Sequence, residues 1–260
     1  MTDVLTQVLD DLAAEGDRLD ALVADVDDAG WRTATPAPGW DVAAQVAHLA
    51  WTDDVAPKAA TDKDAWDAVV LDAIADPEGY VDQQALAIAR DKADLLGRWR
   101  RARTDLRAAL ATYPSGQKMP WFGPPMSATS MATARLMETW AHSLDVHEGL
   151  GAPVEDTDRI RHVAHLGVRT RNFAYAVHGL DAPAEEFRID LVAPSDDVWS
   201  WGPEDAAQTL TGSAGDFCRL VTQRVHRADT DLVATGPDVD RWLDIAQAFA
   251  GQPGEGRAPR

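Results

Sequence analysis

Glu138 and His142 lie four residues apart in segment 127–150, which is rich in the good helix formers Ala, Met and Leu. Residues four apart project from the same face of a helix, so a carboxylate and an imidazole would lie side by side. Such a pair can hold a divalent metal ion when another part of the chain supplies at least one more ligand. His48 is the best candidate because it is the only histidine in the first 140 residues. The sequence therefore predicts that two helices face each other and bind one metal ion through His48, Glu138 and His142.

This ligand set limits the chemistry of the site without fixing the metal. Two histidines and a glutamate bind zinc in some catalytic sites, where a fourth position is left for water or substrate. Two histidines and a carboxylate also bind iron(II) in non-haem oxygenases. Cys218 is the single cysteine, which excludes an intramolecular disulfide and any metal site built from several cysteines. We therefore expect a divalent ion with a chemical role, with zinc as the first choice.

Two polar residues near the expected ligands could support them. A histidine ligand usually has its second ring nitrogen tied to an acceptor, and Asp145, one turn beyond His142, is a candidate for that acceptor. Arg135, three residues before Glu138, could instead pair with the glutamate carboxylate. His147 lies five residues after His142, which rotates it by about 140° on an ideal helix and predicts a surface position.

The segments that must position these residues follow a helical pattern over the first two thirds of the chain. Helices are predicted at residues 4–26, 42–55, 62–75, 80–113, 127–150 and 156–178. The loop at 114–126 carries two aromatic residues and two methionines, more large apolar groups than a solvent-exposed loop usually has, so we expect it to cover another part of the protein. The candidates for the walls of a substrate pocket are Trp51, Trp121, Phe122, Met126 and Trp140.

The pattern changes after residue 179. Apolar and polar residues alternate with the period of a strand at 187–192, and further strands are expected at 197–201, 208–212 and 231–235. Helices are expected at 214–226 and 240–250, and the tail at 251–260 is expected to be disordered. The fold class is therefore α+β, with a helical domain at 1–180 and a small αβ domain at 181–250.

Composition excludes several classes of partner. The net charge of −19 and the pI near 4.5 argue against nucleic-acid binding and against binding to anionic lipid. No segment approaches the ~18 consecutive apolar residues of a membrane span, and we expect no signal peptide because the first residues lack a basic and an apolar stretch. We expect a cytoplasmic monomer or small homo-oligomer that acts on a small molecule.

Three segments, GWDVAAQVAHLAW, ETWAHSLD and LTGSAGDFCRLVTQR, resemble the mycothiol-dependent maleylpyruvate isomerase family, within the DinB-like metal-binding proteins. The segments WFGPPM, ARLMETWAH and RWLDIAQAFAG resemble an actinobacterial metal-binding subfamily of unknown function. The resemblance implies a four-helix bundle followed by a sterol-carrier-like αβ domain. It places the family's three metal ligands on His48, Glu138 and His142. The family's aspartate three residues after the second histidine falls on Asp145, and an arginine implicated in activity falls on Arg224.

The resemblance also implies a reaction in which the metal activates the thiolate of mycothiol for attack on an electrophile. The sequence thus favours a thiol-dependent transferase or isomerase. Two alternatives stay open: a metal-dependent hydrolase or non-haem iron oxygenase that uses the same ligands, and a non-catalytic protein that binds a metal or a small molecule.

Overall fold

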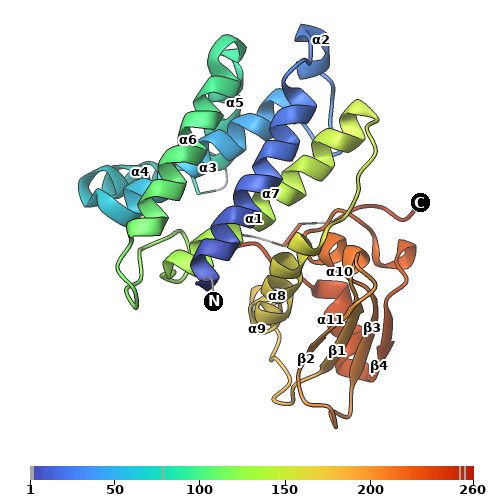
Figure 1. Ribbon diagram of the computed structural model, residues 1–260. Coiled ribbons are helices and arrows are strands. Elements are labelled where there is room, and N and C mark those ends of the chain that lie inside the picture. The colour runs from blue at the N-terminus through green and yellow to red at the C-terminus, as the bar shows by residue number, and fades with distance from the viewer. Residues whose placement is uncertain (1–2, 78, 252, 255) are drawn as a thin grey trace. The chain divides into compact units, whose positions relative to one another are not determined.

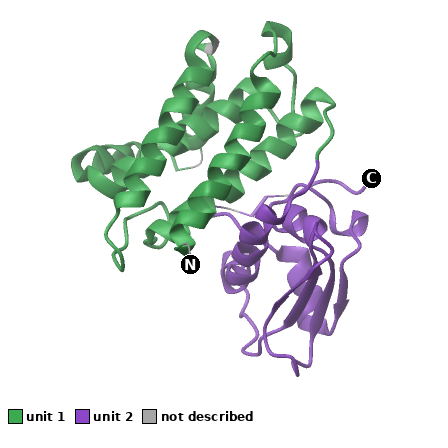
Figure 2. Ribbon diagram, viewed as in Figure 1, with its two compact units in different colours: residues 1–154 green, residues 155–260 purple. Residues whose placement is uncertain are grey.

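The computed structural model describes residues 3–77, 79–251, 253–254 and 256–260. The chain forms two compact units, residues 1–154 and 155–260 (Figure 2). The first unit is helical and the second combines helices with a sheet (Figure 1). The α+β class predicted from the sequence is confirmed. No described helix is both long enough and apolar enough to cross a membrane.

Four long helices dominate the first unit. They are α1 (Val4–Val23), α3 (Val42–Thr61), α6 (Lys92–Thr112) and α7 (Ala128–Leu150), joined by the shorter α2 (Asp28–Trp31), α4 (Lys63–Ala75) and α5 (Tyr80–Ala89). α3 is central because it packs against α4, α5, α6 and α7, while α1 covers α7 and α6. Every residue of α3 from Val42 to Asp53 is buried, because neighbouring helices surround this alanine-rich segment and its few polar side chains lie in the interior.

The single helix predicted at 80–113 is in fact two helices, and that prediction was wrong. The break falls at Arg90 and Asp91, where Asp91 takes a non-helical backbone conformation with φ −96° and ψ 75°. α5 and α6 both pack on α3 and also contact each other, which one straight helix could not do. Burial of Ala85 and Ala89 on one side of the break, and of Leu95 on the other, explains why the chain turns here.

The second unit is a four-stranded sheet with helices packed on it. Its strands are β1 (Arg188–Val192), β2 (Val198–Trp201), β3 (Thr209–Ser213) and β4 (Val233–Thr235), in the order β2-β1-β3-β4. β1 and β3 are parallel, while the two outer pairs are antiparallel. α10 (Ala214–Val221) packs on β1 and β3, and α11 (Pro237–Ile245) contacts β4. The rings of Phe187 and Phe217 lie 5.9 and 5.7 Å from that of Trp242, which is completely buried in this core.

The boundary between the units lies at residues 154 and 155, earlier than the predicted boundary at 180. The helix predicted at 156–178 consists of η1 (Asp158–Ile160), α8 (Arg161–Arg169) and α9 (Arg171–Val177), which belong to the second unit. α8 packs on α10 and α9 on α11. The approach of α8 is close at Gly167, because a Cβ atom there would lie 2.9 Å from the Val221 side chain. The described residues of the tail after 250 form no helix or strand, and their predicted disorder stays a prediction.

Candidate metal centre

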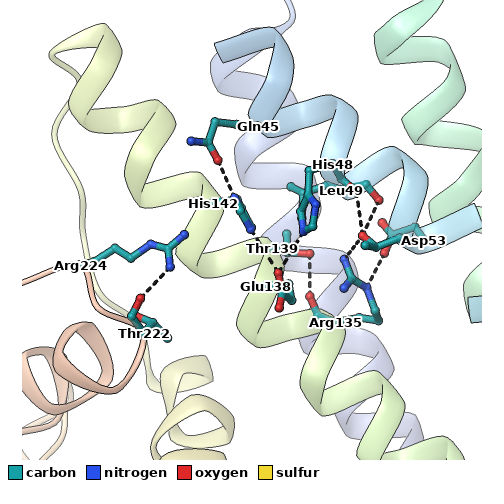
Figure 3. A network of polar contacts seen from close by, with 11 residues as sticks. Gln45, His48, Leu49, Asp53, Arg135, Glu138, Thr139, His142, Thr222 and Arg224 are labelled. Carbon is teal, nitrogen blue, oxygen red and sulfur yellow. Dashed lines mark hydrogen bonds and ion pairs between the residues drawn. The ribbon is translucent and has the colours of Figure 1, made fainter. Parts of the chain in front are cut away.

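Three side chains predicted as metal ligands converge in the first unit. His48 lies in the middle of α3, and Glu138 and His142 lie one turn apart in the middle of α7, which packs against α3. Glu138 Oε2 is 3.2 Å from His48 Nε2 and 3.1 Å from His142 Nε2 (Figure 3). One potential ligand atom from each residue lies within 4.8 Å of the others. Two ligands bound at about 2 Å to the same ion lie at most ~4 Å apart, so only a small adjustment would be needed to bind one.

Local sequence explains why both helices are well defined here. Asp41 begins α3 by accepting a hydrogen bond from the backbone N–H of Ala44 at 2.8 Å. Ser127 caps α7 in the same way, with its hydroxyl oxygen 3.1 Å from the backbone nitrogen of Ser130. α7 ends at Gly151, whose positive φ of 64° is a conformation that glycine adopts without strain. The ligands therefore stand on the interior of long helices and not on loops.

The hydrogen bonds around His142 define which of its nitrogens can bind a metal. Thr35 Oγ1 donates to the backbone oxygen of Trp40 at 2.8 Å and accepts from Gln45 Nε2 at 2.8 Å. This orients the amide of Gln45 so that its Oε1 lies 2.5 Å from His142 Nδ1, which must then carry the proton. Neutral His142 consequently directs the lone pair of Nε2 toward Glu138. Two acceptors that face each other repel, and a cation between them would remove this repulsion. The donor set therefore fits a bound metal ion.

The His48 ring is positioned mainly by packing. Its Nδ1 is buried and has no hydrogen-bond partner among the described residues. The rings of Trp40 and Trp51 lie 5.4 and 6.3 Å from the imidazole, and the ring of His142 lies 4.5 Å away. These contacts direct Nε2 toward Glu138 without a polar tie on the second nitrogen.

The electrostatic environment keeps Glu138 ionised. Burial by itself would raise the pKa of this carboxyl group. Hydrogen bonding to His142 and His48, and the positive charge that these rings carry when they are protonated, outweigh burial and hold the pKa of Glu138 well below its usual range. An ionised carboxylate between two imidazoles is the protonation state that binding of a divalent cation requires.

Arg135 does not pair with Glu138, contrary to one of the two sequence expectations. Its Nε donates to Asp53 Oδ1 at 2.9 Å (Figure 3). Its Nη2 donates to the Thr52 hydroxyl at 2.5 Å. Asp53 also accepts a hydrogen bond from Trp99 Nε1 at 3.1 Å. Asp53 was not foreseen, because nothing in the local sequence of α7 indicates a carboxylate from α3. Burial decides the outcome, since a buried guanidinium requires an ionised partner.

The remaining polar predictions have mixed outcomes. Asp145 is buried on α7, and its support of His142 stays a prediction; the acceptor seen at His142 Nδ1 is Gln45. His147 is buried, so its predicted surface position was wrong. Burial first and the charge of Arg18 second lower the pKa of His147. Arg224 lies in the second unit after α10, where its Nη1 donates to the backbone oxygen of Thr222 at 2.6 Å.

Most of the predicted pocket residues form an aromatic cluster. Trp51 stacks on Phe122 with ring centroids 6.2 Å apart, and Trp121 stacks on Trp66 of α4 at 5.7 Å. The loop at 114–126 therefore covers α3 and α4, as its apolar composition predicted. Met126 pairs through its backbone with Met119 in this loop.

Trp140 was predicted as a pocket residue and does not lie at the ligands, whereas Trp40 was not predicted and does. Trp140 is buried and lies two residues from both Glu138 and His142, which places it about 200° around the helix and away from a pocket at the ligands. Trp40 was not predicted, yet its ring stacks on His142 at 5.8 Å. Gln45 was also missed. It lies three residues before His48 on the same helix face, a spacing that could have indicated it.

Comparison with known proteins gives the family. The sequence model described as "Mycothiol maleylpyruvate isomerase N-terminal domain" matches residues 12–147, which include all three candidate ligands. A second model, "Wyosine base formation", matches residues 183–235 of the second unit. The Mycobacterium tuberculosis proteins "Uncharacterized protein MT0041" (strain CDC 1551 / Oshkosh) and "Uncharacterized protein Rv0036c" (strain H37Rv) are each 55% identical over 248 residues, which cover 95% of this chain and 96% of theirs.

The fold is similar to that of a crystal structure of the mycothiol-dependent maleylpyruvate isomerase, with a TM-score of 0.58 at 16% identity, covering 92% of this chain and 98% of that one. A crystal structure of a mutant of that isomerase gives a TM-score of 0.57 at 15% identity with the same coverage. The sequence match across the helical unit and the shared fold lead to one conclusion: this chain belongs to the mycothiol maleylpyruvate isomerase family.

Proposed function

We propose that this protein is a metal-dependent enzyme that uses a low-molecular-weight thiol, mycothiol, to modify a small electrophilic metabolite as a transferase or an isomerase. The observation that carries the proposal is the convergence of His48, Glu138 and His142, with their ligand atoms within 4.8 Å of one another. Three protein ligands leave one position of a tetrahedral zinc ion for a further group, as in catalytic zinc sites. The family of the chain supports a thiol as that group.

His48, Glu138 and His142 would hold the ion, and zinc is the metal we propose. A zinc ion held there would lower the pKa of a thiol enough for the thiolate, which is the nucleophile, to form near neutral pH. Gln45 keeps the proton of His142 on Nδ1 and so keeps Nε2 available as a ligand. The pKa of Glu138 lies well below its usual range, so its carboxylate is ionised and able to bind the ion.

The aromatic cluster next to His48 would bind the apolar part of a reactant. Trp51 links the His48 ring to Phe122, whose side chain is 44% exposed although it is large and apolar. Ligand pockets are lined mainly by apolar and aromatic side chains, and this cluster places several of them beside His48. In an isomerisation the thiolate adds to a conjugated double bond, rotation follows and the thiolate leaves; in a transfer it stays bonded to the product.

The first test is the metal content of protein purified without added metal. We expect close to one zinc ion per chain in the wild type and little in His142→Ala, because two remaining ligands rarely hold the ion. His147→Gln on the same helix is the matched control and should keep the metal even if the loss of a buried ring lowers its melting temperature.

The second test measures the consumption of mycothiol with a panel of model electrophiles. Thiol loss should depend on the metal and should fall to the uncatalysed rate in His142→Ala. Bound metal without turnover of any thiol would contradict the proposal and favour a binding protein. Iron in place of zinc, together with oxygen consumption, would favour an oxygenase.

A further inference from the structure

An open cavity of about 620 Å³ lies within the first unit, between the connection of α2 to α3 and helix α5. Its lining includes Arg32, Thr35, Trp40 and Asp41 from the connection and Arg90 from the end of α5. Its volume is in the range of ~300–1,000 Å³ that is typical of small-molecule sites.

The cavity borders the candidate metal centre. Trp40 is common to both, since it lines the cavity and its ring lies 5.4 Å from that of His48 and 5.8 Å from that of His142. Thr35 is a second link, because it lines the cavity and holds Gln45, which in turn holds His142. A ligand in the cavity would therefore lie against the residues that orient the predicted metal ligands.

Two arginines give the cavity a positive charge, although the chain as a whole is acidic. Over the whole chain, 43 acidic residues outnumber 24 lysines and arginines. On α6, Arg100 and Arg107 pair with aspartates of α1. By contrast, neither Arg32 nor Arg90 has a hydrogen-bond or ion-pair partner for its guanidinium among the described residues.

The one carboxylate that lines the cavity does not neutralise both arginines. Asp41 is engaged at the start of α3, where its Oδ1 accepts a hydrogen bond from Ala44. Two guanidinium groups and one capping aspartate leave a net positive lining. Arginine is the side chain best suited to bind a carboxylate or phosphate, because its planar group can donate two parallel hydrogen bonds.

We propose that this cavity binds the anionic group, a carboxylate or a phosphate, of a substrate whose reacting part lies at the metal centre. Arg32 and Arg90 supply the charge, and Trp40 forms the wall that the cavity shares with the candidate metal centre. The identity of the substrate as an anionic electrophile rests on the proposed function, whereas the binding of an anion to the arginines does not.

Isothermal titration calorimetry of the full chain at low ionic strength tests the proposal. The probes are succinate, inorganic phosphate and the neutral analogue succinamide. Each is titrated into wild type, Arg32→Gln, Arg90→Gln and His142→Ala. Arg98→Gln is the matched control, because Arg98 is an exposed arginine of α6 outside the cavity. Circular dichroism verifies that every variant is folded.

We expect succinate or phosphate to bind the wild type and succinamide not to bind. The anion that binds more tightly identifies the preferred group, a carboxylate or a phosphate. Each cavity variant should weaken binding by roughly tenfold or more, the effect of one charge-assisted hydrogen bond, while Arg98→Gln should not change it. His142→Ala should still bind the anion, so this result stands even if the thiol assays fail.

Three results would overturn the cavity as an anion site. The first is the absence of binding of either anion to the wild type. The second is equal binding by the wild type and both cavity variants. The third is binding that is lost in His142→Ala and kept in the cavity variants, because the anion would then bind at the metal itself.

Discussion

The ion pair of Asp53 with Arg135 is the part of the site whose removal should have the largest effect on stability. Its side chains are 1% and 3% exposed, and the Nε–Oδ1 distance is 2.9 Å. The pair also holds Trp99 and Thr52, so it connects helices α3, α6 and α7. Replacing one member of a buried pair leaves the other charge without a partner, which costs about 3–5 kcal/mol.

Asp53→Leu should lower the free energy of unfolding by about 3–5 kcal/mol. In a unit of roughly 150 residues each kcal/mol lowers the melting temperature by ~2–4 °C, so the total decrease should be roughly 6–20 °C. Asp10→Asn is the matched control. It breaks an Arg–Asp pair between helices of the same bundle, with Arg107, and the two side chains are 59% and 43% exposed. An exposed ion pair contributes at most about 1 kcal/mol to the free energy of unfolding, so this variant should change the melting temperature by only a few degrees.

A double-mutant cycle separates the ion pair from simple loss of packing. Arg135→Met alone should also destabilise the protein, because it leaves Asp53 buried and unpaired. The double variant Asp53→Leu/Arg135→Met should lose less than the sum of the single losses, with a coupling of about 2 kcal/mol or more in urea unfolding. Additive losses, or a loss below about 1 kcal/mol for Asp53→Leu, would show that the two groups are not a buried charge pair.

Three further predictions concern neighbours of the ligands. Gln45→Leu should weaken zinc binding by roughly 10–100-fold in a competition titration with a chelator, because His142 loses the acceptor that fixes its tautomer. Asp145→Asn should cost a similar factor if Asp145 supports His142, and an unchanged affinity would remove that role. His147 has a pKa below the ordinary ~6.5 because it is buried, so the unfolded chain is protonated first as the pH falls. Thermal unfolding should therefore show stability being lost below about pH 6.5, with a shallower loss in His147→Gln.

The sequence was sufficient to predict that the three candidate ligands lie together, because the placement of two of them depends on one helical period. Glu138 and His142 must share a face of any helix that contains both, and few histidines are available to complete the set. The partner of Arg135 could not be found in this way. Its nearest carboxylate along α7 is Glu138, but the group that pairs with it is on another helix. Spacing within one segment predicts neighbours on that segment only.

His147 shows the same limit for burial. It lies on the same continuous helix as His142, and the inference of a surface position failed because α1 packs on α7 and covers further faces of it. The break at Arg90 and Asp91 was missed for a related reason. The helical pattern continues across it, and the need for α5 and α6 to pack on the same central helix is a property of the tertiary structure.

The geometry of the candidate centre is set by groups other than the metal ligands. On one side of the ligands, the buried pair of Asp53 and Arg135 fixes the position of α3 relative to α7. On the other side, Gln45 of α3 holds His142 of α7 through a hydrogen bond. Both ties join the two helices that carry the ligands, and neither requires an ion. The cost of bringing a carboxylate and two imidazoles together is therefore met by the folding of the bundle, so a metal ion would bind to ligands that are already in place.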